Sequence, residues 1–396
     1  MTAAHEALEE LRHRLDRHPA DRYPIQHATT RFHLGALLLE RDEPEGAAAD
    51  LERAVELFAE LPAERAKARN MWGVARRATG DLDEAAAAFA VAAQEFGVAE
   101  LPLEQAAALF NLGLVQLQLG EPDAAAASLG VAAATFDEHG AVLQVAAALR
   151  EQGVALLTAG RPTEAVPLLT EALARAERGP DDAGRGQAAN ALGLSQLATG
   201  DAAGAVTSLG KAVVAHPAGL RPGAHAMAKT NLALAYEAAD DHPRARLAAA
   251  QALVSGAPTG AVHDQGVALL GRLGPVTDDL PRTLATEDPS RWQAVIRNEA
   301  MRWLCLRDEE ADAAAAALIE AMGDDDGQPV AEAWLGTLLE APPAEMAALL
   351  RIAWRVGGTR AGFVSTLRDA IVTFPPPQLF RLEAVFAAET GLDARR

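Results

Sequence analysis

Five glycines recur about every forty residues in this chain, and each is followed twelve positions later by an alanine. The glycines lie at 35, 73, 113, 153 and 193, and the alanines at 47, 85, 125, 165 and 205. A sixth unit keeps the frame with Ala233 and Ala245, although the first spacing is two residues short. An internal period of about 20–50 residues is typical of chains that stack one supersecondary unit, because a single unit cannot bury its own apolar face. The sequence therefore predicts a repeat architecture through residue 256.

Turn signals and apolar stripes recur in the same frame. The segment Gly120-Glu121-Pro122-Asp123 combines a helix C-cap with a proline suited to the first turn of the next helix. Ala125, Leu129 and Ala132 then follow helical spacing. The other units keep this arrangement, with turns at 80–83, 160–163 and 200–203 and with Phe89, Leu169 and Leu209 in the place of Leu129. Each unit is predicted to be a helical hairpin in which the large residue fills the space above the glycine–alanine pair.

The pattern resembles the tetratricopeptide repeat family. In that family a small residue in the first helix is followed twelve positions later by alanine, then by a large apolar residue and another alanine, as in Gly113, Ala125, Leu129 and Ala132. The resemblance covers roughly residues 27–256, with a period near 40 rather than 34, as in the branch that includes kinesin light chain-like proteins. It implies an all-α fold, a right-handed superhelical solenoid whose first helices line a concave groove for an extended peptide or a partner helix.

Asparagines recur in the predicted first helices. The resemblance implies that the residues at and beside them face the groove: Lys67, Asn70, Phe110, Asn111, Gln118, Arg150, Asn190, Thr230 and Asn231. A carboxamide both donates and accepts hydrogen bonds, which suits a peptide backbone. Asparagine is also tolerated on any polar helix face, so both interpretations stay open. Chaperone-binding relatives use a clamp of which Asn111 matches the middle member, but Val74, Ala147 and Glu151 occupy the flanking places, so an acidic chaperone tail is not the expected ligand.

The sequence predicts four regions along the chain. Residues 1–26 form a capping region with a helix at 4–18, residues 27–256 form six repeats, residues 257–289 hold a degenerate seventh first helix and a linker, and residues 290–396 form a smaller helical C-terminal domain. The linker is expected at 274–289, which is rich in Pro, Asp and Thr. Further helices are expected at 330–340, 344–356, 360–373 and 378–390. Four of the five tryptophans follow residue 290 and belong either to the core of this domain or to a contact patch.

Charge and composition narrow the class of partner and the compartment. The chain has 35 Lys+Arg and 55 Asp+Glu, a net charge of −20, which disfavours nucleic acid and anionic lipid as partners. No apolar stretch approaches the roughly 20 residues of a membrane span, and the N-terminus lacks the pattern of a signal peptide. We expect a cytoplasmic protein. Lysine occurs only at 67, 211 and 229 while arginine is abundant, which fits a GC-rich bacterial genome.

Motifs for catalysis, metals and cofactors are weak. Cys305, the only cysteine, is interpreted as a small buried hydrophobe, the alternative being a nucleophile with a histidine partner. The segment 204–211 has the wrong spacing for a phosphate loop, and Gly184-Arg185-Gly186 lacks a preceding strand and is interpreted as an inter-repeat loop. The acidic run 324–327 lacks the alternation of a calcium loop, and the histidine pairs at 13/18 and 27/33 lack zinc spacing. No catalytic residue, metal or cofactor is predicted.

These observations predict a non-catalytic scaffold or adaptor that holds a peptide segment or a partner protein in its groove. One alternative is a regulator that responds to a peptide or metabolite. The other is an enzyme whose site lies in the C-terminal domain. The sequence leaves the identity of the partner and a homo-oligomeric state open.

Overall fold

The computed structural model describes residues 3–254, 259–276, 279–323 and 327–391. All regular elements in these ranges are helices, as the sequence predicts. The chain divides into two compact units, Met1–Thr199 and Gly200–Arg396. The division falls inside the fifth predicted repeat, and the predicted boundaries near residues 26, 256 and 289 remain predictions.

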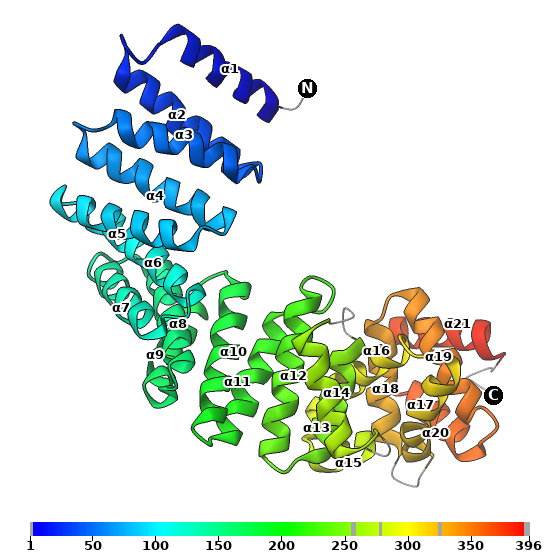
Figure 1. The fold of residues 1–396 in the computed structure, drawn as a ribbon. Helices are drawn as coiled ribbons and strands as arrows, with labels where there is room; N and C mark the ends of the chain where they lie inside the picture. The colour runs from blue at the N-terminus through cyan, green and yellow to red at the C-terminus, as the bar shows by residue number, and fades with distance from the viewer. Residues whose placement is uncertain (1–2, 255–258, 277–278, 324–326, 392–396) are drawn as a thin grey trace. The chain divides into compact units, whose positions relative to one another are not determined.

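The first unit is a stack of helices in which each helix packs against the next one along the chain (Figure 1). The first of them lies where the capping helix is predicted. The helices are α1 (Ala3–Arg17), α2 (Pro24–Glu40), α3 (Pro44–Leu57), α4 (Pro62–Thr79), α5 (Leu82–Val98), α6 (Pro102–Gln118), α7 (Pro122–Glu138), α8 (Val142–Thr158), α9 (Pro162–Ala176) and α10 (Asp182–Ala198). Proline in the first turn begins six of these helices, since its missing N–H has no partner there in any case.

Four of the five repeat glycines, Gly35, Gly73, Gly113 and Gly153, lie directly against the large residue sixteen positions later. A Cβ atom placed on Gly113 would lie 2.5 Å from Cγ of Leu129, and one placed on Gly153 would lie 2.4 Å from Cγ of Leu169. Ala125 and Leu129 are completely buried. The missing Cβ therefore lets the two helices of a hairpin approach closely, which confirms the predicted register of the repeat.

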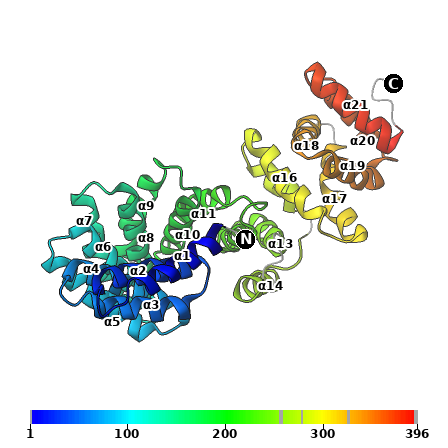
Figure 2. The same ribbon diagram turned by 90° about the horizontal axis from the view of Figure 1, so that it is seen from above.

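The second unit completes the repeats and carries the C-terminal helices (Figures 1 and 2). Its α14 packs against both α12 and α13, at the place of the predicted seventh first helix. The elements are α11 (Ala202–Ala215), α12 (Pro222–Ala238), α13 (His242–Val254), α14 (Ala261–Leu273), α15 (Asp279–Thr286), a 3₁₀ turn η1 (Pro289–Arg291), α16 (Trp292–Trp303), α17 (Asp308–Met322), α18 (Gln328–Glu340), α19 (Pro343–Gly357), α20 (Ala361–Ile371) and α21 (Pro376–Thr390). The last four match the four further helices that the sequence predicts.

The segment expected to be a linker contains a packed helix. Within residues 274–289, α15 buries Leu280 and Leu284 in a cluster with Leu247 of α13. The two leucines are four residues apart and share one helix face, a signal that the Pro, Asp and Thr content of the segment conceals. The prediction of a linker at 274–289 did not include this helix.

The C-terminal helices enclose a tryptophan-containing core. Trp303 and Trp334 are completely buried with ring centroids 5.5 Å apart. Trp292 and Trp354 are partly buried and pack against the same cluster. Cys305 is exposed, so its prediction as a buried hydrophobe is wrong, because α16 ends at Trp303 and the following turn carries the thiol outward. None of the described helices is both long enough and apolar enough to cross a membrane.

The turn of the sixth repeat departs from the others in a way that can be tested. The preceding repeat turns at Gly200 with φ 83°, whereas the corresponding Asp240 adopts φ 59°. A side chain in this left-handed region is strained, and glycine is not. We expect Asp240→Gly to stabilise the second unit by about 0.5–1 kcal/mol in chemical denaturation, and Asp240→Ala to destabilise it. Equal stability of the glycine and alanine variants would contradict this account of the turn.

Candidate functional site

The first helices of the repeats lie on the inner side of the first unit. Within its described residues, α2, α4, α6, α8 and α10 contact one another in succession, more closely than the second helices α3, α5, α7 and α9 do. Helices on the inner side of a curved stack come closer together than those on the outer side. The first helices therefore line the concave face of this unit.

Two of the predicted asparagines meet on this face. The Nδ2 group of Asn111 on α6 donates a hydrogen bond to Oδ1 of Asn70 on α4, at 3.3 Å, and both side chains are half-buried. Within the described residues, this bond leaves the amide nitrogen of Asn70 and the amide oxygen of Asn111 without a protein partner. The pair thus presents one donor and one acceptor, the combination that a peptide backbone requires.

Four other predicted site residues lie on the first helices α4, α6 and α8, and their side chains differ in exposure. Lys67 donates to Glu64 at 2.9 Å, and Arg150 binds the neighbouring Glu151 at 2.7 Å. Phe110 is half-buried beside Asn111, and Gln118 is exposed at the end of α6. The ion pairs occupy Lys67 and Arg150, so a ligand would compete with an existing partner at each.

The remaining three predicted site residues are buried. Asn190, Thr230 and Asn231 are 8%, 1% and 6% exposed. The Thr230 hydroxyl donates to the carbonyl of Ala226 in its own helix, at 3.0 Å. Of the four asparagines expected outside the packed core, only Asn70 and Asn111 are outside it. A role for the nine residues in binding remains a prediction.

A row of aliphatic residues lies beside the asparagine pair. It consists of the residue that follows four of the five repeat glycines, and all members are half-buried: Val74, Leu114, Val154 and Leu194. Val74 follows Asn70 by four residues and Leu114 follows Asn111 by three, so each lies on the same helix face as its asparagine. The groove residues predicted from the sequence do not include this row, although its members each follow a repeat glycine directly.

A guanidinium group adds a positive charge to this face. Arg77 lies two turns after Asn70 on α4 and is half-buried. Among the described residues, its side chain has no hydrogen bond or ion pair. Its neighbour Arg76, by contrast, pairs with Asp81 at 3.0 Å and lies over the ring of Trp72. Arg77 can therefore bind an anionic group without first breaking an ion pair.

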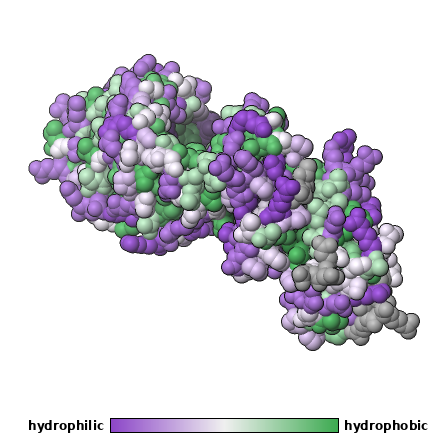
Figure 3. All heavy atoms as spheres, turned by 90° about the horizontal axis from the view of Figure 1, so that it is seen from below, coloured by the Kyte–Doolittle hydropathy of each residue, from purple (hydrophilic) through white to green (hydrophobic). Residues whose placement is uncertain are grey.

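Hydrophobic and hydrophilic residues are mixed on the surface of the molecule in the view of Figure 3. Within the part of the chain that the structure describes, no group of three His, Cys, Asp or Glu side chains is arranged to hold a metal.

Both glycine-rich segments considered in the sequence analysis lie in helices. Residues 204–211 lie in α11, as expected. Gly184 and Gly186 lie in the first turn of α10 rather than in a loop, because the Asp181 carboxylate caps that helix by accepting from the Gly184 N–H at 2.9 Å. The acidic run at 324–326 lies outside the described residues.

Comparison with known protein families agrees with the helical repeat fold. Residues 32–100, 131–183 and 190–261 match the tetratricopeptide repeat family. The repeat region of this chain belongs to that family. No curated protein sequence matches the chain.

Several solved structures are similar to the chain. The apo form of the quorum sensor NprR from B. thuringiensis is 13% identical, with a TM-score of 0.51 and with 89% of this chain and 96% of that chain covered. NprR in complex with its cognate peptide NprX has 12% identity and a TM-score of 0.43, covering 82% of this chain and 100% of that chain. BtubC from P. vanneervenii is 20% identical with a TM-score of 0.48, covering 54% of this chain and 91% of that chain. At these identities the similarity to NprR shows the fold.

Proposed function

We propose that this tetratricopeptide repeat protein is a non-catalytic cytoplasmic scaffold whose first unit binds an extended peptide segment of a partner protein on its concave face. The observation that carries the proposal is the Asn70–Asn111 amide pair, which offers a donor and an acceptor beside a row of aliphatic side chains. Backbone hydrogen bonds would hold the peptide, and the row headed by Val74 and Leu114 would receive its apolar side chains. The net charge of −20 argues against nucleic acid as the ligand.

The second candidate is a peptide-responsive regulator. It is favoured by the buried polar contacts, described below, that link α12 of the last repeat to the C-terminal helix α16. A passive scaffold has no need of such a link, whereas a regulator must transmit a change from its repeats to another part of the chain.

The proposal predicts a loss of peptide affinity when the amide pair is removed. Peptides selected from a random library on the immobilised full-length protein would be titrated against the double variant Asn70→Ala/Asn111→Ala. Two lost hydrogen bonds remove roughly 1–3 kcal/mol, so Kd should rise by about 5- to 150-fold. Both asparagines are half-buried, so the far-UV circular dichroism should be unchanged.

A variant on a second helix serves as the control. Val131 on α7 is 54% exposed, and Val131→Asn should leave peptide affinity unchanged. Wild-type affinity in the asparagine double variant would remove the amide pair from the binding site. Leu114→Glu tests the aliphatic row separately, because a carboxylate placed there should abolish binding of apolar peptides.

A further inference from the structure

A chain of buried polar side chains crosses three helices of the second unit. The Nζ group of Lys229 on α12 donates to Oε1 of Gln251 on α13 at 2.5 Å, and Nε2 of Gln251 donates to Oε2 of Glu299 on α16 at 3.0 Å. The three residues are 4%, 7% and 1% exposed. The chain therefore links the first helix of the last repeat to a C-terminal helix through one amide group.

The far end of this chain enters the C-terminal core. The second carboxylate oxygen of Glu299, Oε1, accepts from Nε of Arg302 at 2.9 Å and from Nε1 of Trp303 at 3.3 Å. Trp303 is completely buried and packs against Trp334. A displacement of the Glu299 carboxylate would therefore change the hydrogen bond that the indole N–H of Trp303 donates to it.

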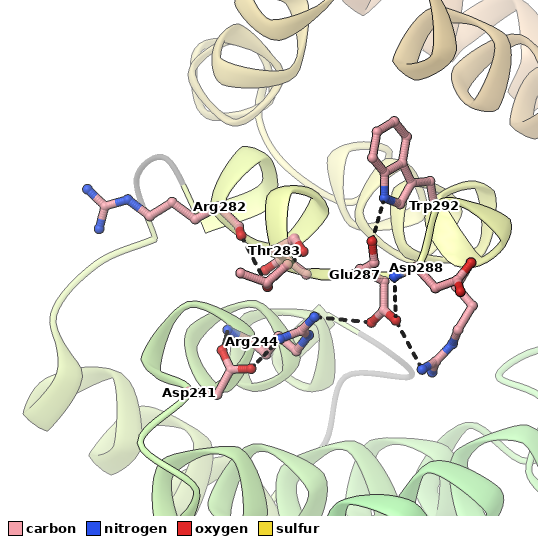
Figure 4. A network of polar contacts seen from close by, with 9 residues as sticks. Asp241, Arg244, Arg282, Thr283, Glu287, Asp288 and Trp292 are labelled. Atoms are coloured by element: carbon pink, nitrogen blue, oxygen red, sulfur yellow. Dashed lines mark hydrogen bonds and ion pairs between the residues drawn. The ribbon is translucent and has the colours of Figure 1, made fainter.

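Other buried polar contacts accompany the apolar packing of Leu247, Leu280 and Leu284 around α13. Arg246 binds the completely buried carboxylate of Asp279 at 2.6 Å, and Arg244 reaches Glu287 at 3.2 Å (Figure 4). The backbone carbonyl of Glu287 in turn accepts from Nε1 of Trp292 at 3.1 Å. Such bonds are directional and costly to leave half-formed when buried, so an interface of this kind has discrete arrangements rather than a continuous range.

The charge of Lys229 is sensitive to this environment. Burial lowers the pKa of Lys229 to about 8, against the opposing attraction of Glu299. Arg302 lies beside Glu299 on α16, His225 lies one turn earlier on α12, and on α13 the neutral amide of Gln251 accepts from Lys229. Among the described residues, neither α11 nor α14 gives Lys229 a hydrogen bond or ion pair.

We propose that the Lys229–Gln251–Glu299 chain is a coupling element that transmits a change at α12 to α16 and the C-terminal core. The Gln251 amide accepts with its oxygen and donates with its nitrogen, so a rotation that breaks one bond also breaks the other. Lys229 is followed directly by Thr230 and Asn231, so a contact made by α12 is next to the start of the chain. The proposal does not depend on peptide binding by the first unit.

Removing the proton from Lys229 should weaken the coupling between α12 and α16, so a change of pH can test the coupling without a ligand. Below pH 8 the ammonium is charged, and its attraction to Glu299 supports the chain. Above pH 8 the folded protein releases that proton while an unfolded lysine keeps it up to about pH 10.5. Stability therefore rises between these values as the burial penalty disappears, while the coupling weakens. As the pH rises through this range, the free energy of unfolding should increase while the coupling between α12 and α16 decreases.

The test follows Lys229 and Trp303 by nuclear magnetic resonance in the full-length protein. The protein contains only three lysines, so lysine labelling gives three signals, and the variant Lys229→Met identifies the signal of Lys229. We expect its midpoint near pH 8 and an indole N–H signal of Trp303, assigned with Trp303→Phe, that shifts with the same midpoint. In Lys229→Arg, which stays charged, the indole shift should be lost.

A substitution of Gln251 tests whether the Trp303 signal responds to Lys229 through the Gln251 amide or only because the two residues are near each other. In Gln251→Leu, Lys229 should still titrate while the Trp303 signal no longer follows it. Lys67→Met, on an exposed lysine of the first unit, should leave the Trp303 titration unchanged. A Trp303 signal that ignores Lys229 in the wild type, or follows it equally in Gln251→Leu, would overturn the proposal.

Discussion

Replacing Glu299 with alanine should lower the free energy of unfolding of the second unit by about 3–5 kcal/mol. The change leaves Arg302, 8% exposed, and Lys229, 4% exposed, without the carboxylate that compensates their burial. It also removes the acceptor of the Trp303 indole. Tryptophan fluorescence during denaturation reports on this unit, since four of the five tryptophans follow residue 290.

An exposed ion pair of the same helical region provides the control. Arg297 and Glu340 lie 2.6 Å apart with side chains 50% and 47% exposed. Water screens such a pair, so Glu340→Ala should change stability by less than about 1 kcal/mol. Equal losses in Glu299→Ala and Glu340→Ala would mean that burial does not set the strength of the Glu299 interactions.

Replacing Gly113 with leucine should destabilise the first unit by about 1–3 kcal/mol. Even its Cβ atom would lie 2.5 Å from Cγ of Leu129, a central atom of a completely buried side chain that cannot move aside. Denaturation followed by far-UV circular dichroism measures the loss. The exposed Glu121, eight residues later, is the matched site, and Glu121→Leu should change stability by no more than about 0.5 kcal/mol.

A compensating pair tests whether the loss comes from this one contact. Gly113→Ala should destabilise the wild type but much less a protein that already carries Leu129→Ala, since the smaller side chain leaves room for the added methyl group. Additive losses in the double variant would place the effect outside the Gly113–Leu129 contact.

Local recurrence in the sequence hints at the special position of Lys229. Residues 18–31 and 216–229 both begin with His-Pro-Ala and carry a second histidine nine residues later. In each segment, Nδ1 of the second histidine lies close to the carbonyl oxygen of the first, at 2.8 and 2.7 Å. The last residue of each segment, Arg31 or Lys229, bonds to a side chain of the following helix. This recurrence indicates that Lys229 lies on the face of its helix that packs against the next helix, but it gives no sign that Glu299 belongs to the same polar network.

Local spacing and turn residues were enough to predict the repeat frame and most helices. Gly113 and Leu129 are sixteen residues apart and meet inside one hairpin, so their contact follows from local spacing and turn residues. Helices such as α19 and α21 were predictable because prolines set their starts. The asparagine positions were also visible in the sequence, since each lies two or three residues before the small residue of its repeat, Gly73, Gly113, Gly193 or Ala233.

The packing of the helices, by contrast, sets which polar residues are exposed and which are buried. Asn70 and Asn190 occupy the same place relative to their glycines, yet one is half-buried and the other is 8% exposed. Gln251 lies 22 residues after Lys229 and 48 before Glu299, on separate helices, so no periodicity connects the three. Burial and long-range polar pairing depend on how helices pack against neighbours distant in the chain, and local spacing carries no record of that packing.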